Sequence, residues 1–436
     1  MSNQTAVSTP SSSTRLVALK LMRSVLRRRQ AFDHAVNCCE EFSVLSSRDR
    51  AFVWLLVATC LRRLGQIDRL IARCISSPLP KAAWPVNDML RLGVAQIFFL
   101  NTPPYAAVDN TVNLASGRMS RYRKLINAVL RRLVREGIPW CESQDAERLN
   151  TPDWLWRSWC GAYGESMARQ IATVHLQEAP LDITAKNTTS ILVELLEAKL
   201  LPTGTLRVDA GGPVAERPGF VEGQWWVQDA AAALPVALLG EIANARVIDL
   251  CAAPGGKTAQ LCSRGADVVA VDRSRSRLQI LGRNLDRLRL NAELVNEDVA
   301  DWQPRSPAKY VLLDAPCSAT GTIRRHPEIL HLKSPDDVER AVVVQDQLLD
   351  AAATMLAPGG VLVFATCSLQ PEEGLERVEN LLGRRPELER FLLLPNEREF
   401  FAPFLNEQGD LRTLPAHLAE DGGMDGFYAA RLKRKH

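Results

Sequence analysis

Apolar residues recur at helical spacing through the first third of the chain. Thr14 precedes Leu16, Leu19, Met22 and Leu26, a spacing that places these side chains on one face of a helix. The same periodicity predicts further helices at about 47–62, 66–76, 86–100, 105–117 and 121–136. We therefore predict an all-α domain over residues 14–137, preceded by a Ser- and Thr-rich disordered tail over residues 1–13.

The next stretch, residues 138–230, mixes two kinds of pattern. Leu181–Ala185 and Thr205–Val208 alternate as strands do, and Ser190–Leu200 has the spacing of a helix. We predict a small α+β connector domain. Its three closely spaced tryptophans are expected to be core residues rather than base-stacking residues: Trp154, Trp156 and Trp159.

Residues 231–436 alternate short apolar runs with helical stretches. This order predicts a doubly wound, mostly parallel, Rossmann-like α/β sheet. Ligands of such sheets bind at the carboxyl ends of the strands. The predicted strands are Arg246–Cys251, Ala266–Val271, Ala292–Val295, Tyr310–Leu313 and Gly360–Thr366.

Composition narrows the class of protein. A chain of 436 residues suggests two or three domains, and 46% hydrophobic with 24% charged residues is typical of soluble proteins. The longest apolar run, Ala51–Leu61, is too short to span a bilayer, and no signal peptide is recognisable, so we expect a cytoplasmic protein. The ten cysteines show no paired zinc spacing, so no metal site is predicted.

Positive charge is concentrated in the first third of the chain. Residues 1–137 hold 21 Lys and Arg against 8 Asp and Glu, whereas the remainder is acidic. Such a basic module favours binding of a nucleic acid, although solvated helix faces would also account for the charge. The candidate phosphate contacts are Arg121, Arg123, Lys124 and Arg131.

The stretch Asp249–Thr258, D-L-C-A-A-P-G-G-K-T, predicts a strand, a tight loop and a helix start, which is a geometry for binding a small molecule. A phosphate-binding loop would need a glycine at position 251, where Cys251 stands, and a dinucleotide loop needs G-x-G-x-x-G. S-adenosylmethionine carries no phosphate and needs carboxylates for its ribose and adenine. Asp272, Asp298 and Asp314 follow successive strands and could supply them.

Two cysteines also follow neighbouring strands, in Asp314-Ala-Pro-Cys317-Ser and Ala365-Thr-Cys367-Ser. C5 of a pyrimidine is a weak nucleophile, but addition of a thiolate to C6 moves electron density to C5, which can then take a methyl group. One cysteine would attack and a second group would assist release. Buried core cysteines remain an alternative for either residue, and the chemistry alone does not rank them.

These motifs together resemble the RNA (cytosine-C5)-methyltransferases, and most closely their bacterial small-subunit ribosomal RNA branch, the RsmB/Sun/Fmu type. The resemblance rests on D-L-C-A-A-P-G-G-K-T, D-A-P-C-S, A-T-C-S and Gly423–Tyr428, in this order. The first third resembles the RNA-binding NusB family through Tyr105–Asn110 and Leu125–Arg132. The likeness covers nearly the whole chain.

The resemblance implies roles for individual residues. Cys367 is expected to be the nucleophile and Cys317 to help release the product, whereas analogy with the DNA cytosine enzymes would have chosen Cys317 to attack. Asp314 and Lys257 are expected to touch the target base, and Arg324 and Arg325 to contact the RNA backbone. The expected cofactor-binding residues are Cys251, Ala252, Ala253, Pro254, Gly255, Gly256, Lys257, Asp272, Arg277, Asp298 and Asp314.

We therefore expect an S-adenosylmethionine-dependent enzyme that methylates C5 of a cytidine in 16S ribosomal RNA, acting as a monomer before subunit assembly. A transfer-RNA methyltransferase has the same chemistry and remains open. A non-catalytic antitermination factor is the interpretation suggested by the first third alone. The modified cytidine and the base that removes the C5 proton are not specified by the sequence.

Overall fold

A computed structural model describes residues 10–187, 189–209 and 211–436. These residues form two compact units. The first consists of the chain up to Arg157 together with His326–Lys333, and the second of Ser158–Arg325 and Ser334–His436. The first unit thus extends past the boundary at residue 137 that the sequence suggests.

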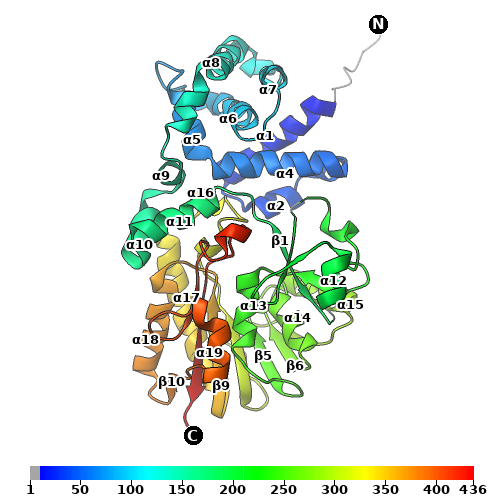
Figure 1. Ribbon diagram of the computed structural model, residues 1–436, viewed down its shortest axis with the longest axis vertical. Coiled ribbons are helices and arrows are strands. Elements are labelled where there is room, and N and C mark those ends of the chain that lie inside the picture. Colours follow the sequence, from blue (N-terminus) through cyan, green and yellow to red (C-terminus); the bar gives the residue numbers. More distant parts are fainter. Residues whose placement is uncertain (1–9, 188, 210) are drawn as a thin grey trace. The chain divides into compact units, whose positions relative to one another are not determined.

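The first unit is helical, as predicted (Figure 1). Its buried core is built from apolar faces of several helices and includes Leu21, Leu56, Ile67 and Leu90. The helices are α1 (Pro10–Arg28), α2 (Phe32–Asn37), α3 (Glu40–Ser43), α4 (Ser47–Arg62), α5 (Leu64–Ala72), α6 (Trp84–Phe98), α7 (Pro104–Leu114), α8 (Arg123–Glu142) and α9 (Ala146–Asn150), and α10 (Asp153–Tyr163) crosses the unit boundary.

Two helix boundaries differ from the prediction. Helix α1 begins at Pro10, so the last four residues of the predicted disordered tail are helical, while residues 1–9 lie outside the described residues. Helix α8 continues through Gly137 and Pro139 to Glu142. A side chain at Gly137 would lie 2.5 Å from the Phe98 ring, so this glycine permits close packing of α8 on α6 rather than ending the helix.

A short segment from far along the chain completes the helical unit. Residues 326–333 contain α16 (Ile329–Leu332), in which an imidazole nitrogen of His331 lies 2.7 Å from the Leu61 carbonyl oxygen. The Phe32 amide donates to the Glu328 carboxylate at 3.2 Å. The sequence pattern of the first third contains no sign of this insertion.

The second unit contains a four-stranded antiparallel sheet in the order β2-β3-β1-β4. The strands are β1 (Leu181–Ala185), β2 (Lys199–Leu200), β3 (Leu206–Val208) and β4 (Trp225–Val227), with α11 (Glu165–His175) before them and α12 (Thr189–Leu195) among them. The helix predicted to reach Leu200 therefore ends at Leu195. Glu197 adopts a left-handed backbone with φ of 50°, which turns the chain into β2.

The larger sheet has the order β10-β12-β9-β8-β5-β6-β7, with β11 paired to β12. The predicted parallel part is confirmed in β5 (Arg246–Leu250), β6 (Asp267–Val271), β7 (Glu293–Val295), β8 (Ala308–Asp314) and β9 (Leu356–Thr366). An antiparallel edge that was not predicted is formed by β10 (Leu388–Arg390), β11 (Leu411–Thr413) and β12 (Phe427–Arg434).

Both faces of this sheet are covered by helices (Figure 1). Ile248 and Leu250 pack with α17 (Pro335–Met355) and α18 (Leu375–Arg384), whereas Val247 packs with α13 (Ala230–Ala237) and α19 (Pro395–Phe401). Burial on two faces explains the continuous apolar runs in the sequence. No helix in the described ranges is long and apolar enough to cross a bilayer.

Candidate active site

The loop after β5 has the backbone shape that its sequence predicts. Cys251 and Gly255 adopt positive φ values of 59° and 105°, and α14 (Gly256–Ser263) begins directly after them. A side chain at Gly255 would lie 2.7 Å from Leu281 on α15 (Arg275–Leu288), so only glycine fits here. The loop thereby presents the start of α14 at the carboxyl edge of the sheet.

The predicted carboxylates lie around this loop. Asp272 accepts hydrogen bonds from the Ala253 amide at 3.1 Å and the Ser274 amide at 2.8 Å. Arg277 donates to the Ala253 carbonyl oxygen. Asp272 and Arg277 therefore hold the loop in shape. The Asp298 carboxylate accepts from the Ala300 amide at 3.1 Å and lies 3.9 Å from the exposed Arg273 guanidinium, and at 41% exposure it can be reached from solvent.

A third carboxylate, Asp249, is fully buried at the end of β5. One of its oxygens accepts from the Thr258 hydroxyl at 2.6 Å, and the other has no hydrogen-bond partner among the described residues. Burial raises the pKa of Asp249 to about 7, although the Thr258 hydrogen bond opposes the shift.

These groups fit S-adenosylmethionine. The loop lacks the glycine pattern that cradles phosphate, and carboxylates stand where hydroxyl and amino groups would need acceptors. The buried Asp249 oxygen without a partner lies within the same loop–helix element. Asp272 and Asp298 would hold the polar groups of the cofactor, and the Cys251–Lys257 backbone would line it. The described residues contain no group of three metal-binding side chains.

Lys257 and Asp314 form a pair at the same edge. The Lys257 ammonium donates to the Asp314 carboxylate at 2.7 Å and lies 4.8 Å from the centre of the Phe427 ring. The lysine side chain is 9% exposed and the aspartate 33%. Asp314 is thus open on one side, as a residue that touches a substrate must be.

The two cysteines predicted from the motifs lie side by side. Cys317 follows β8 and Cys367 follows β9, and their sulfurs are 3.4 Å apart. The hydrogen bond to Cys367, together with burial, raises the pKa of the Cys317 thiol well above its usual range. Cys317 therefore stays protonated and can donate its proton toward the Cys367 sulfur.

The backbone after Cys317 packs closely against the Cys367 loop. The Gly321 amide donates to the Cys367 carbonyl oxygen at 2.9 Å, and the Gly426 amide donates to the Gly321 carbonyl oxygen at 2.8 Å. A side chain at Gly321 would lie 1.9 Å from the Gly426 carbonyl oxygen. The three motifs that contain Cys317, Cys367 and Gly426 thus meet at one point.

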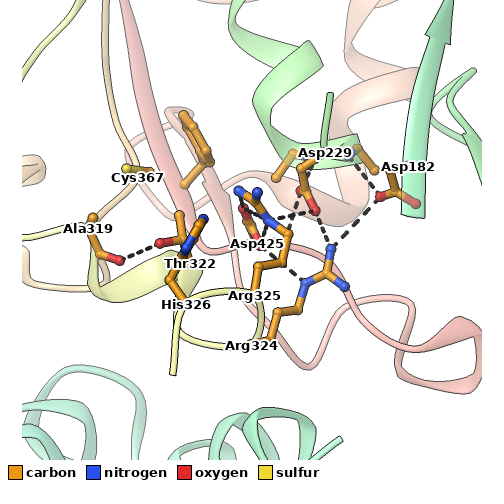
Figure 2. A network of polar contacts seen from close by, with 12 residues as sticks. Asp182, Asp229, Ala319, Thr322, Arg324, Arg325, His326, Cys367 and Asp425 are labelled. Carbon is orange, nitrogen blue, oxygen red and sulfur yellow. Dashed lines mark hydrogen bonds and ion pairs between the residues drawn. The ribbon is translucent and has the colours of Figure 1, made fainter. Parts of the chain in front are cut away.

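Arg324 is buried in an ion-pair cluster, contrary to its expected contact with RNA. Its side chain is 1% exposed and pairs with Asp229 and, at 3.1 Å, with Asp425 (Figure 2). A guanidinium enclosed by carboxylates is not available to phosphate, so the predicted backbone contact is wrong for Arg324 in this conformation.

Arg325 lies at the edge of the same cluster. It is 35% exposed and pairs with Asp425. Burial alone would lower the pKa of Arg325, but the charges of Asp425 and Asp229, with a smaller contribution from Cys367, raise it above its ordinary value. Arg325 thus remains charged, and its contact with RNA stays a prediction.

The candidate phosphate contacts of the helical unit are all exposed. Arg123 donates to Asn113 at 2.8 Å, and Arg131 donates to Asn127 at 3.0 Å. Arg131 also lines a groove of about 600 Å³, whose other residues include the exposed Tyr105. Arg121 packs on the neighbouring Tyr122 ring, and Lys124 is exposed beside it.

Comparison with known proteins places the chain in a family. The 16S rRNA methyltransferase RsmB/F family model matches residues 236–433, and the NusB family model matches residues 12–135. Ribosomal RNA small subunit methyltransferase B of Pseudomonas putida is 34% identical over 438 residues, covering 96% of this chain and 98% of that protein. The chain belongs to the ribosomal RNA small subunit methyltransferase B family.

A second relative agrees with this assignment. Methyltransferase B of Shewanella oneidensis is 32% identical over 435 residues, covering 96% of this chain and 98% of that protein. As a member of the methyltransferase B family, the protein is an S-adenosylmethionine-dependent methyltransferase.

Solved structures share the fold. The crystal structure of PH0851 matches with a TM-score of 0.75 at 21% identity, covering 98% of this chain and 99% of that one. NSun6 from Pyrococcus horikoshii with SFG matches with a TM-score of 0.55 at 19% identity, covering 65% and 98%. At these identities the likeness shows the fold alone.

Some residues of this site were not predicted from the sequence. Asp425 lies within the predicted motif Gly423–Tyr428, but its ion pairs with Arg324 and Arg325 were not predicted. Asp182, Asp229 and Glu373 stand in no motif that was singled out, and only the three-dimensional contacts bring them to the cysteine loops.

Proposed function

We propose that the protein methylates C5 of a cytidine in 16S ribosomal RNA through a covalent adduct between Cys367 and C6. The observation that carries this proposal is the pair of sulfurs 3.4 Å apart at the carboxyl ends of β8 and β9. Methyl transfer to nitrogen or oxygen would need no such pair. The family assignment supports ribosomal RNA of the small subunit as the substrate.

In this mechanism the Cys367 thiolate adds to C6, forming a carbon–sulfur bond, and electron density moves to C5. The bound cofactor supplies an electrophilic methyl group on sulfur. After C5 has been methylated, a base removes the C5 proton, the C5–C6 double bond reforms and the carbon–sulfur bond breaks, returning the thiolate. Cys317, which stays protonated, donates a hydrogen bond to the departing sulfur.

The Lys257–Asp314 pair supports the same assignment. A partly exposed carboxylate beside a lysine can orient the amino group of cytosine. The target cytidine must be unstacked for a thiol to reach C6, at a cost of about a few kcal/mol if the base is paired.

Substitution of each cysteine tests the mechanism. Cys367→Ala should abolish methyl incorporation into 16S RNA, a loss of about 10³-fold or more, because no thiolate can add to C6. Cys262→Ala is a matched control, since Cys262 lies in the same unit on α14 away from the sulfur pair. Methylation unchanged in Cys367→Ala would contradict the nucleophile assignment.

Cys317→Ala separates addition from release. We expect this variant to leave a protein–RNA adduct that survives a denaturing gel, because the departing sulfur loses its proton donor. Addition of Cys367→Ala to the same chain should remove the adduct. Release at the normal rate in Cys317→Ala would show that Cys317 has no part in it.

We further propose that RNA before subunit assembly is the substrate, with the exposed arginines of the helical unit tracking its phosphates, and that the enzyme acts as a monomer in the cytoplasm. Methylation of naked 16S RNA and of assembled subunits should be compared, and activity confined to subunits would contradict the first point. Mass mapping of the product also distinguishes ribosomal from transfer RNA.

A further inference from the structure

Glu373 is a buried carboxylate between the two cysteine loops. It ends the short helix η5 (Pro371–Glu373) and is completely buried. Its first oxygen accepts from the Ser318 amide at 2.7 Å and from Gln345 at 3.3 Å. Its second oxygen accepts from the hydroxyls of Ser318 and Ser368, the latter at 2.5 Å.

The residues that bind this carboxylate directly follow the two reactive cysteines. Ser318 is next to Cys317, and Ser368 is next to Cys367. The two serine hydroxyls are themselves 3.2 Å apart. A single carboxylate therefore holds both cysteine loops, each one residue from its sulfur.

Further contacts brace the same cluster. The Thr320 hydroxyl lies 3.2 Å from the Ser368 hydroxyl and accepts from the Leu369 amide at 3.0 Å. Gln345 of α17 also donates to the Pro316 carbonyl oxygen at 2.9 Å, just before Cys317. The backbone on either side of Cys317 is thus tied to the carboxylate or to its partners.

Stability alone does not account for this arrangement. An ionised carboxylate accepts about four hydrogen bonds, and Glu373 has four donors. Within the described parts of the chain, however, Glu373 takes part in no ion pair, and a buried charge without a counter-ion costs several kcal/mol of desolvation. Apolar side chains could join two loops more cheaply, so what the cluster adds is a defined geometry.

We propose that Glu373 is a positioning residue that sets the separation of the Cys317 and Cys367 sulfurs through Ser318 and Ser368. This inference rests on the proposed function for its meaning, since Cys317 must lie within hydrogen-bond distance of the Cys367 sulfur to assist its departure from C6. The Glu373 charge also helps to raise the pKa of Cys317, after the Cys367 hydrogen bond and burial, and so helps to keep Cys317 a proton donor.

The separation can be measured without RNA or cofactor. Equilibration with oxidised and reduced glutathione converts two thiols and one glutathione disulfide into a Cys317–Cys367 disulfide and two glutathione thiols. Mass spectrometry of the linked peptide gives the effective concentration of one thiol toward the other. The full-length protein is used throughout, with Cys317→Ala as the blank.

Glu373→Leu keeps the side chain's volume and removes all four hydrogen bonds. We expect the effective concentration to fall about tenfold or more, because hydrogen bonds to a charged group are the strong ones. Glu373→Gln keeps the shape of the side chain and some of its hydrogen bonds. Its effective concentration should lie between that of Glu373→Leu and that of the wild type. Glu376→Gln, three residues along and exposed, should leave the value unchanged.

Turnover gives a second measurement. In Glu373→Gln the kcat for RNA methylation should fall while the KM values for RNA and cofactor stay constant, and adduct should accumulate. If Glu373 had only a structural role, Glu373→Gln would lower the urea midpoint. The effective concentration of one thiol toward the other, measured in the folded protein, would then be unchanged. An unchanged effective concentration in folded Glu373→Gln would overturn the proposal.

If Glu373→Leu fails to fold, Ser368→Ala and Ser318→Ala carry the test, since each removes one hydroxyl donor and should lower the effective concentration severalfold. Unchanged values in both would again overturn the proposal. Should the effective concentration fall as expected while the wild type places no methyl group on cytosine C5, the proposed function fails and the positioning role stands.

Discussion

Two buried acidic clusters hold the loop that follows Cys317, and they satisfy their carboxylates in different ways. At Ser318 the loop is bound to Glu373, whose donors are two hydroxyls, an amide and a glutamine. Six residues later, Arg324 enters a cluster of three arginines and three aspartates. That cluster consists of Arg207, Arg324, Arg325, Asp182, Asp229 and Asp425.

The two clusters differ in how they respond to the loss of one side chain. The charges of the ion cluster balance, and although burial alone would raise the pKa of Asp229, the Arg324 and Arg325 charges hold it below its ordinary value. Removal of one member leaves a charge without a partner in the interior. The hydroxyl cluster can lose one donor at a time, which suits a role in adjusting distance rather than in holding the fold.

The largest effect is expected from Arg324→Ala. This change leaves Asp229 and Asp425 buried with one cation fewer, and we expect a loss of about 3–5 kcal/mol in the free energy of unfolding. Urea denaturation measures it.

Arg246→Ala is the matched control for this change, because the Arg246–Glu293 pair is about half exposed on both sides. Its removal should cost about 0.2–1 kcal/mol. Equal losses in the two variants would show that burial does not distinguish these ion pairs.

Asp249 is an intermediate case, because it is buried with a single hydroxyl donor. Its pKa in the folded protein is raised to about 7, above its value in the unfolded chain. Between about pH 4 and 7 the folded state keeps a proton that the unfolded chain has lost, so stability falls as pH rises through this window.

Asp249→Asn should remove this slope. Relative to wild type, the variant should gain of the order of 2–3 kcal/mol in unfolding free energy between pH 5 and pH 8. Urea titrations at the two pH values measure the difference. A constant difference would mean that Asp249 is ionised in the folded protein throughout the range, with its second oxygen satisfied.

These three carboxylate sites show which parts of the molecule could be predicted from the sequence. The loop Asp249–Thr258 and the two cysteines were found because each motif is local, and the order of strands and helices places the motifs at one sheet edge. Glu373 was not found, because its serine partners lie 55 and 5 residues away and nothing in the sequence marks a buried glutamate.

Arg324 was predicted to bind RNA for a related reason. The expectation rested on the resemblance and on the position of Arg324 just after the Cys317 loop, whereas the partners of Arg324, Asp229 and Asp425, are 95 and 101 residues away. The strands β10, β11 and β12 were missed because antiparallel edge strands interrupt the regular alternation of strand and helix that the prediction followed.

A smaller loss of stability than in Arg324→Ala is expected at Gly321, between the two clusters. Gly321→Ala would bring a methyl group within 1.9 Å of the Gly426 carbonyl oxygen, so the loop must shift away from Cys367. We expect a loss of about 1–3 kcal/mol in unfolding free energy, because the overlap is with backbone and the buried loop must shift to relieve it. Gly383→Ala in α18, where nothing lies within 4 Å, should instead gain about 0.5–1 kcal/mol.

Gly321 also tests whether the clusters act independently. If Glu373 alone sets the sulfur separation, the loop in Gly321→Ala should move only after Ser318 and leave Cys317 in place. The Cys317–Cys367 disulfide equilibrium with glutathione should then stay near the wild-type value. If the ion cluster contributes through the loop, the equilibrium falls together with that of Arg324→Ala. Because Gly321 binds the Cys367 carbonyl oxygen directly, we expect a fall in Gly321→Ala that exceeds the one in Arg324→Ala, even though its loss of stability is smaller.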